Sequence, residues 1–241
     1  MNGAAPRFLD VGEAALAVEF GDAVDAALND RVLALDAAFA ARPPEGVREC
    51  VPTYRSLLIH YDPLAIGRDA LIADVEQKLA ALPAHRAEGA RWLLPCCYDP
   101  ECGEDIALAA SLLGMTPGHL AAVQARTEYR VFMYGFAPGF AYLGGLPAEL
   151  ALSRRTTPRP PYPHGAVMIG GGLCAVATAP MPTGWYVIGR TPERLFAPER
   201  AHPFFIEAGD TLRFQAVDLP AFRALEARAA AGERVAQRIA A

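Results

Sequence analysis

Residues 166–177 read AVMIGGGLCAVA, and this stretch decides the fold class of the chain. Its two apolar runs, 166–169 and 174–177, have the length and composition of β-strands, and the glycines between them indicate a turn. The same pattern of short apolar runs between glycine and proline turns extends from Glu128 to Val217. Further strands are predicted there at 129–134, 185–188 and 211–214. Many short strands of this kind predict a closed or nearly closed β-barrel.

The segments on either side of this region carry helical signals. Three elements are predicted before it, namely a strand at 92–98 and helices at 104–113 and 117–126. Gly114 suits the end of the first helix, and Thr116-Pro117 suits the start of the second. After it, the tail from Pro220 to Ala241 is rich in Ala, Arg and Glu and predicts a helix, either docked on a partner or solvated.

The N-terminal third has a different pattern. Its predicted elements are a strand at 15–20, an amphipathic helix from Val24 to Phe39, strands at 47–51 and 57–61, and a second amphipathic helix at 68–82. They predict an α+β unit with its helices on one side of an antiparallel sheet. The small and polar stretch 83–90 is the best candidate linker. We therefore expect an α+β domain at 1–88 and a mainly-β barrel domain with a C-terminal helix at 89–241.

Composition excludes several classes of function. A net charge of −5 and a pI of about 5.6 argue against a nucleic-acid or anionic-membrane partner. No apolar run reaches the roughly 18 residues of a membrane span. The chain has five cysteines and no secretion signal is recognised, so we expect reduced thiols in the cytoplasm. The cluster from Cys96 to Cys102 does not suit a metal, because adjacent cysteines alternate across a strand. Lys78, the only lysine, is expected on a surface helix, which leaves lysine chemistry one candidate.

The loop at 134–145, YGFAPGFAYLGG, is the least ordinary part of the sequence. Gly135 and Gly139 permit a positive φ or a close backbone approach, and Pro138 fixes its own φ. Phe136 and Tyr142 alternate with these small residues. The pattern suits backbone amides and aromatic faces placed beside a small flat ligand. It equally suits a glycine-bent corner of the barrel with aromatic side chains in the core.

Two further segments carry candidate functional groups. Arg154, Arg155 and Arg159 lie on a proline-rich segment that leads to His164. Paired guanidinium donors suit a carboxylate or phosphate, although a solvated basic loop paired with carboxylates is the alternative. Similarly, His164 suits either proton transfer or an ordinary surface position. The segment 182–192, PTGWYVIGRTP, predicts a turn, a strand and an exit turn. The glycine run at 170–172 lacks the following Gly-Lys-Ser/Thr of a phosphate loop.

Three blocks, in this order, resemble the family of allophanate hydrolase subunit 1, also called the 5-oxoprolinase B subunit. They are the loop at 134–145, the arginine segment that leads to His164, and the segment 182–192. The resemblance covers nearly the whole chain and includes 12–21, 51–58 and Gly209-Asp210. The family also includes the Kip-type inhibitor of a sporulation histidine kinase and the carboxyltransferase region of urea carboxylase. The resemblance implies a small α+β domain followed by a cyclophilin-like β-barrel. It also implies a partner barrel, the 5-oxoprolinase C-type subunit, and for 5-oxoprolinase an A-type subunit as well.

The sequence departs from the family pattern at several polar positions. Ala166 replaces an expected serine, Leu173-Cys174 replace a Gln-Thr pair, and Ala177 replaces a tyrosine. The stretch Gln124-Ala125-Arg126 lacks a histidine that the family often carries there. These losses imply a changed substrate, or a subunit that no longer needs every group.

Three functions follow from the resemblance. The first is the B subunit of an ATP-dependent 5-oxoprolinase, in which Arg155, Arg159 and His164 are expected to be catalytic. ATP would be bound by a partner or at the shared interface, and no metal site is evident. The residues expected to contact the amide substrate are Gly135, Phe136, Pro138, Gly139, Tyr142, Arg154, Gly184, Trp185 and Arg190. The second is a biotin-dependent urea or amide carboxyltransferase component, and the third is a non-enzymatic inhibitor of a histidine kinase.

Overall fold

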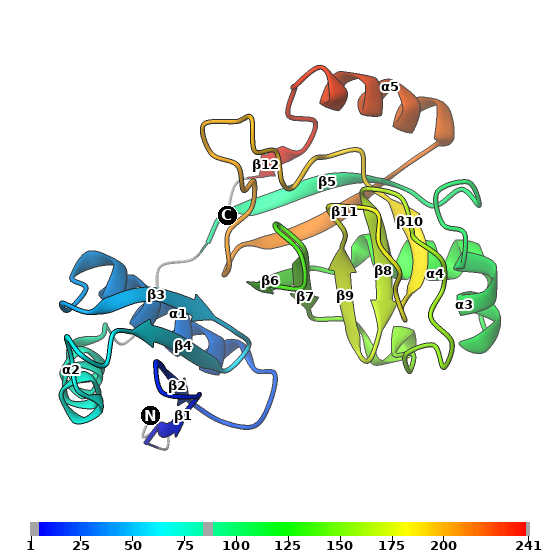
Figure 1. Cartoon of the computed structure of the whole chain (residues 1–241). Coiled ribbons are helices and arrows are strands. Elements are labelled where there is room, and N and C mark those ends of the chain that lie inside the picture. Colours follow the sequence, from blue (N-terminus) through cyan, green and yellow to red (C-terminus); the bar gives the residue numbers. More distant parts are fainter. Residues whose placement is uncertain (1–4, 84–88, 240–241) are drawn as a thin grey trace. The chain divides into compact units, whose positions relative to one another are not determined.

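The protein is represented by a computed structural model that describes residues 5–83 and 89–239. The chain divides into two compact units, Met1–Glu88 and Gly89–Ala241 (Figure 1). Most of the predicted linker, residues 84–88, lies outside the described residues. Each unit is described by itself below.

The N-terminal unit is a four-stranded antiparallel sheet with two helices. The sheet has the order β1-β2-β4-β3. Its elements are β1 (Arg7–Asp10), β2 (Ala15–Glu19), α1 (Ala26–Ala41), β3 (Val47–Pro52), β4 (Ser56–Tyr61) and α2 (Arg68–Ala81). Alternate residues of the central strands, such as Leu16 and Ile59, are buried in one cluster with Phe39 of α1 and Val75 of α2. Both helices therefore pack on one face of the sheet, as the sequence predicts.

Lys78 lies on α2, a helix with an exposed face, as the sequence predicts. Its side chain is buried, and its Nζ lies 3.0 Å from Oδ2 of Asp74 and 4.9 Å from the ring centroid of Phe39. Helix α2 is amphipathic, and position 78 falls on the face that meets α1. The ion pair and the cation–π contact compensate for burial of the charge.

The C-terminal unit is built on one sheet that closes on itself. Its strand order is β10-β8-β9-β7-β6-β11-β5-β12, and an additional pairing of Arg190 with Cys97 joins β10 to β5. Seven strands thus form a closed barrel, and β12 is appended to β5 (Figure 1). The elements are β5 (Arg91–Cys97), α3 (Ile106–Leu112), α4 (Pro117–Arg126), β6 (Tyr129–Tyr134), β7 (Ala141–Gly144), η1 (Ala148–Leu150), β8 (Ala166–Gly170), β9 (Leu173–Val176), β10 (Tyr186–Arg190), β11 (Thr211–Val217), α5 (Leu219–Ala230) and β12 (Gln237–Ile239).

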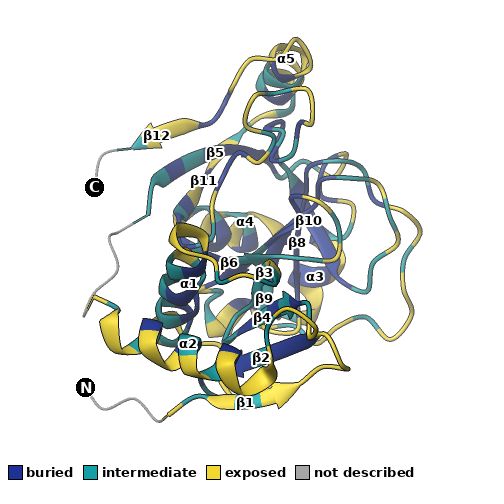
Figure 2. Ribbon diagram, turned by 60° about the vertical axis from the view of Figure 1, so that its left-hand side comes forward, coloured by how far each residue is buried: buried dark blue, intermediate teal, exposed yellow. Residues whose placement is uncertain are grey.

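Strand β8 is apolar on both faces. Val167 and Ile169 belong to the main core cluster, together with residues from α3 and α4. Ala166 and Met168, on the other face of β8, belong to a second cluster that also contains Trp185. Figure 2 accordingly colours most of β8 and β10 as buried. Tyr162 and Trp185, which belong to the segments at 153–165 and 178–185, are buried in this second cluster and so cover part of the outer face of β8.

Several elements differ from the sequence-based prediction, and β1 and η1 were not predicted at all. Residues 141–144, expected in a loop, form β7, which pairs with β6 and β9. The tail is not one helix to its end, because α5 stops at Ala230 and β12 follows. The carboxylate of Glu193 accepts hydrogen bonds from the backbone N–H groups of Val235 and Ala236 at 2.7 and 2.8 Å, which fixes this tail on the barrel.

Within the described residues, no single helix is both long enough and apolar enough to cross a membrane, and only the bent pair α3 and α4 passes that test jointly.

Candidate functional site

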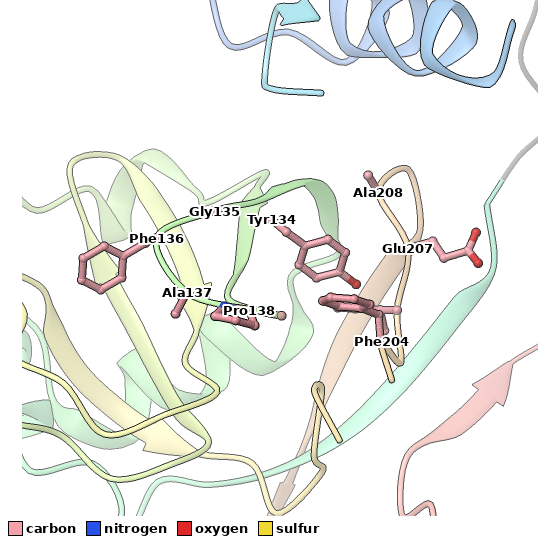
Figure 3. Close-up of a pocket in the computed structure, with 10 residues that line it drawn as sticks. Tyr134, Gly135, Phe136, Ala137, Pro138, Phe204, Glu207 and Ala208 are labelled. Carbon is pink, nitrogen blue, oxygen red and sulfur yellow. The ribbon is translucent and has the colours of Figure 1, made fainter. Parts of the chain in front are cut away.

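A cavity of about 690 Å³ lies beside the loop predicted to bind a ligand. One wall is the segment 134–139, which connects β6 to β7. The other wall is the segment 204–208, which precedes β11. Figure 3 shows the two walls, with Pro138 on the first wall and the ring of Tyr134 facing that of Phe204. The sequence predicted the first wall and missed the second.

Gly139 fixes the shape of the first wall. Its φ is +71°, and a Cβ at this position would lie 2.6 Å from the Cβ of Phe196. The neighbouring carbonyl of Pro138 accepts a hydrogen bond from Oγ1 of Thr178 at 2.6 Å. A side chain at 139 would therefore be both strained and obstructed, so this glycine is required.

Phe136 has the most strained backbone conformation of the loop. It is the one non-glycine residue with a positive φ, 68°, among the described residues, and its side chain is 69% exposed. Its ring makes an edge contact with that of Phe140 at a centroid distance of 5.5 Å. Left-handed backbone in a bulky residue costs about 1–2 kcal/mol, and burial does not repay the cost here. Strain of this kind clusters at ligand-binding sites.

The loop also offers free backbone donors. Its internal hydrogen bonds run from Gly135 to Phe140, from Ala137 to Gly135 and from Phe140 to Ala137. Within the described ranges, the N–H groups of Phe136 and Gly139 have no acceptor. Two unpaired amides on one short loop can stabilise a carboxylate or a developing oxyanion.

The hydroxyl of Tyr134 is a third donor at the cavity. It is buried and has no hydrogen-bond partner among the described residues. Burial raises the pKa of Tyr134, and the charges of Asp210 and Glu207 raise it further, so the hydroxyl stays protonated at neutral pH. Its ring packs against Phe204 at a centroid distance of 5.4 Å. A buried donor without an acceptor suits a polar atom of a ligand.

Asp210 holds the second wall. One of its oxygens accepts hydrogen bonds from the backbone of Glu207 at 3.0 Å and from Nε1 of Trp92 at 2.9 Å. Its other oxygen accepts from the backbone of Ala90 at 2.7 Å. Asp210 belongs to the Gly-Asp pair at which the family resemblance ends, and that pair was the only sequence signal near this wall.

Aromatic side chains connect the cavity to the arginine segment. Centroid distances are 5.0 Å from Phe140 to Tyr142 and 6.1 Å from Tyr142 to Trp185. The guanidinium carbon of Arg154 lies 5.7 Å from the ring centroid of Trp185. We call Tyr142, Arg154 and Trp185 the arginine–aromatic shelf. The structure thus brings together these three predicted site residues, and Phe136 joins them through Phe140.

Arg155 and Arg159 have carboxylate partners. Nη1 of Arg155 lies 3.1 Å from Oδ1 of Asp105, and Nη1 of Arg159 lies 2.9 Å from Oδ2. Arg159 also pairs with Glu104. The backbone N–H groups of the two arginines donate to the carbonyls of Gly184 and Thr183, at 2.8 and 2.9 Å. The predicted catalytic arginines therefore make the carboxylate pairs that the sequence left as the alternative.

His164 and Arg190 lie elsewhere on the barrel, against α5, and neither lines the cavity. Nε of Arg190 donates to the carbonyl of His164 at 3.2 Å, and its Nη2 lies 2.8 Å from Oε1 of Glu226. Burial lowers the pKa of His164, and the positive charges of Arg194 and Arg190 lower it further. The imidazole is therefore neutral at pH 7.

The four altered positions of the family pattern separate into two groups. Ala166, Leu173 and Ala177 pack with Trp185 in the outer cluster, whereas Cys174 faces the main barrel core. Burial raises the pKa of the Cys174 thiol to about 12, so it remains protonated. Three of these four residues thus belong to the apolar surroundings of the shelf.

The sequence of the chain is similar to those of a known protein family and of several characterised proteins. Residues 6–206 match the family described as carboxyltransferase domain, subdomain C and D. The chain is 33% identical over 215 residues to the 5-oxoprolinase B subunit of Bacillus subtilis, covering 85% of this chain and 90% of the relative. It is 32% identical over 205 residues to the 5-oxoprolinase B subunit of Escherichia coli O157:H7, covering 85% and 93%.

Solved structures agree with this grouping. The protein TTHA0988 aligns with a TM-score of 0.75 at 33% identity over 84% of this chain, which spans only 40% of that longer chain. The uncharacterized protein PH0987 from Pyrococcus horikoshii aligns with a TM-score of 0.53 at 32% identity, covering 90% of this chain and 100% of that chain. The K. lactis urea amidolyase aligns with a TM-score of 0.78 at 16% identity, covering 97% of this chain and 16% of that chain, and it shows the shared fold alone. The barrel is cyclophilin-like, as the family resemblance implies.

Proposed function

The chain belongs to the carboxyltransferase domain, subdomain C and D family, and within it we propose that it is the B subunit of an ATP-dependent 5-oxoprolinase. In this role it helps to open the lactam ring of 5-oxoproline to glutamate, together with partners that correspond to the A-type and C-type subunits. The observation that carries the proposal is the similarity to curated 5-oxoprolinase B subunits, which extends over most of the chain.

The chemistry of the cavity agrees with this role. Hydrolysis of an unstrained lactam is uphill, so ATP is expected to activate the carbonyl before water attacks. The activated oxygen carries negative charge, and preorganised donors stabilise such charge. The unpaired amides of Phe136 and Gly139 and the hydroxyl of Tyr134 are the donors that this chain supplies. Their aromatic surroundings suit a small ring.

We assign nucleotide binding to a partner or to the shared interface. The glycine run at 170–172 lacks the lysine and hydroxyl residue of a phosphate loop. Over residues 5–83 and 89–239, no group of three or more candidate metal ligands is found. We propose that this subunit contributes the positioning of the substrate and the stabilisation of charge.

We further propose that the C-type barrel subunit completes the cavity. Phe136 and Phe204 at its rim are exposed by 69% and 47%, and exposed aromatic groups around a concave site are typical of an interface. A partner surface over this rim would exclude water from the activated lactam.

Purification of the tagged chain from its native host tests the proposal. We expect the A-type and C-type subunits to co-purify, and the complex to form glutamate from 5-oxoproline only with ATP. Recovery of a biotin-carboxylating enzyme, with bicarbonate fixed into urea or a related amide, would instead establish the carboxyltransferase. Recovery of a histidine kinase without hydrolysis would contradict both enzymatic functions.

A further inference from the structure

The three arginines of the segment 154–159 differ in their charge partners. Asp105 and Glu104 neutralise Arg155 and Arg159. Arg154 is exposed, and no carboxylate pairs with it among the described residues. An anion that bound Arg155 or Arg159 would have to compete with Asp105, whereas one that bound Arg154 would meet no competitor.

Arg154 is nevertheless held in a defined position. Its guanidinium carbon lies 5.7 Å from the ring centroid of Trp185. Its stem lies beside Gly171, whose N–H donates to the carbonyl of Leu152 at 2.7 Å and so ties this segment to the turn between β8 and β9. A guanidinium over an aromatic face keeps its edge donors available, which is the geometry that suits a carboxylate.

Tyr142 is the second polar residue of the shelf. Its ring makes an edge contact with Trp185. The charge of Arg154 acts on the pKa of its hydroxyl. Burial raises the pKa of Tyr142 and Arg154 opposes this, so the hydroxyl remains protonated at neutral pH. A guanidinium and a phenol beside one indole face make a small site for a planar monocarboxylate.

We propose that Arg154, supported by Tyr142 and Trp185, binds the carboxylate of the substrate, and that Arg155 and Arg159 only hold the segment in place. The assignment rests on the proposed function, in which the substrate is a lactam that carries one carboxylate. Arg154 is then the residue that selects 5-oxoproline over 2-pyrrolidinone, the same lactam ring without the carboxylate.

Fluorine NMR of the complex labelled with 5-fluorotryptophan tests binding without turnover. The chain has two tryptophans, Trp92 and Trp185. Arg238 provides a matched control, because it is exposed and its guanidinium carbon lies 6.0 Å from the ring centroid of Trp92. The Arg154→Gln and Arg238→Gln variants identify the two resonances of this chain. We expect 5-oxoproline to shift the Trp185 resonance, and 2-pyrrolidinone to do so only at much higher concentration.

In Arg154→Gln the affinity for 5-oxoproline should fall about 10- to 100-fold, to the level of 2-pyrrolidinone. Arg238→Gln should bind both ligands as the wild type does. An Arg154→Gln complex that still prefers 5-oxoproline would overturn the assignment. So would loss of that preference in an Arg155→Gln complex with unchanged melting temperature.

Steady-state kinetics separate this inference from the proposed function. If the wild-type complex hydrolyses 5-oxoproline, Arg154→Gln should raise KM for 5-oxoproline by the same factor and change kcat little. An unchanged KM would refute the assignment of Arg154 and leave the proposed function intact. If the wild-type complex does not hydrolyse 5-oxoproline, the proposed function fails. Arg154-dependent binding of 5-oxoproline would then still support the carboxylate site, and its absence would remove that as well.

Discussion

Asp105 accepts a hydrogen bond from Nη1 of Arg159 at 2.9 Å, and the same carboxylate oxygen accepts the backbone N–H of Val187 at 2.9 Å. The N–H of Asp105 donates in return to the carbonyl of Val187 at 2.9 Å. One residue at the start of α3 therefore joins strand β10 to the arginine segment. Since Trp185 lies just before β10, Asp105 also fixes the shelf.

Replacement of Asp105 tests this connection. Asp105→Ala leaves Arg155 and Arg159 largely buried without their carboxylate, and removal of one partner of a buried pair costs about 3–5 kcal/mol. We expect a loss of unfolding free energy of that order in urea denaturation. Glu104→Gln is the control, because Glu104 is 44% exposed and such pairs contribute about 1 kcal/mol or less. Equal losses in the two variants would contradict the role of Asp105.

The strain at Phe136 predicts opposite effects on stability and binding. Phe136→Gly relieves a positive φ, so it should be about 1 kcal/mol more stable than Phe136→Ala, which keeps the strain. Both variants lose the aromatic ring and should bind 5-oxoproline more weakly than the wild type. Chemical denaturation and ligand titration of the pair measure the two effects. A glycine variant no more stable than the alanine variant would show that position 136 is unstrained.

A side chain at position 139 is expected to weaken ligand binding because it changes the shape of the loop. Gly139→Ala introduces a Cβ 2.6 Å from that of Phe196 and should displace the loop, because neither Cβ can rotate away. Gly114→Ala is the control, with a similar φ of +68° and no atom within 4 Å of the new Cβ. Both variants pay the left-handed backbone cost of about 1–2 kcal/mol. Only Gly139→Ala should also weaken 5-oxoproline binding, and equal affinities in the two variants would exclude a role of the loop.

His164 predicts a pH dependence of stability. Its pKa is lowered in the folded protein, so the unfolded chain binds more protons as the pH falls through about 6.5. His164 therefore destabilises the fold at acid pH and contributes no such penalty above neutrality. His164→Asn should narrow the difference in melting temperature between pH 7.5 and pH 5.5. His202→Asn, at an exposed position, should leave it unchanged. An unaltered difference in the His164 variant would show that its imidazole is not desolvated.

Much of the fold follows from local sequence signals, whereas the missing parts depend on tertiary contacts. The apolar runs at 166–169 and 174–177 are strands because their composition requires burial on both faces. β7 was missed because glycines flank it, and only pairing with β6 and β9 defines it as a strand. β12 was missed for a similar reason, since the buried carboxylate of Glu193 and the edge of β5 hold it.

The candidate site divides in the same way. The loop at 134–139 was found because glycine, proline and aromatic residues alternate there. The segment 204–208 has no such pattern and meets the loop only through the barrel. The sequence predicts a helix from residue 104 and gives Asp105 no special role. In the structure Asp105 is the N-cap residue of α3, and its side chain makes no cap hydrogen bond but binds two arginines. Local pattern identified the groups with unusual composition but not their partners.

The rate of glutamate formation from 5-oxoproline and ATP, measured with purified A-type and C-type partner subunits, tests the central claim most directly. We expect no activity from the two partners alone, and activity that rises with added chain to a stoichiometric plateau. The same titration with the Gly139→Ala variant should give a much lower plateau. Full activity of the two partners in the absence of this chain would contradict its assignment as the B subunit of a 5-oxoprolinase.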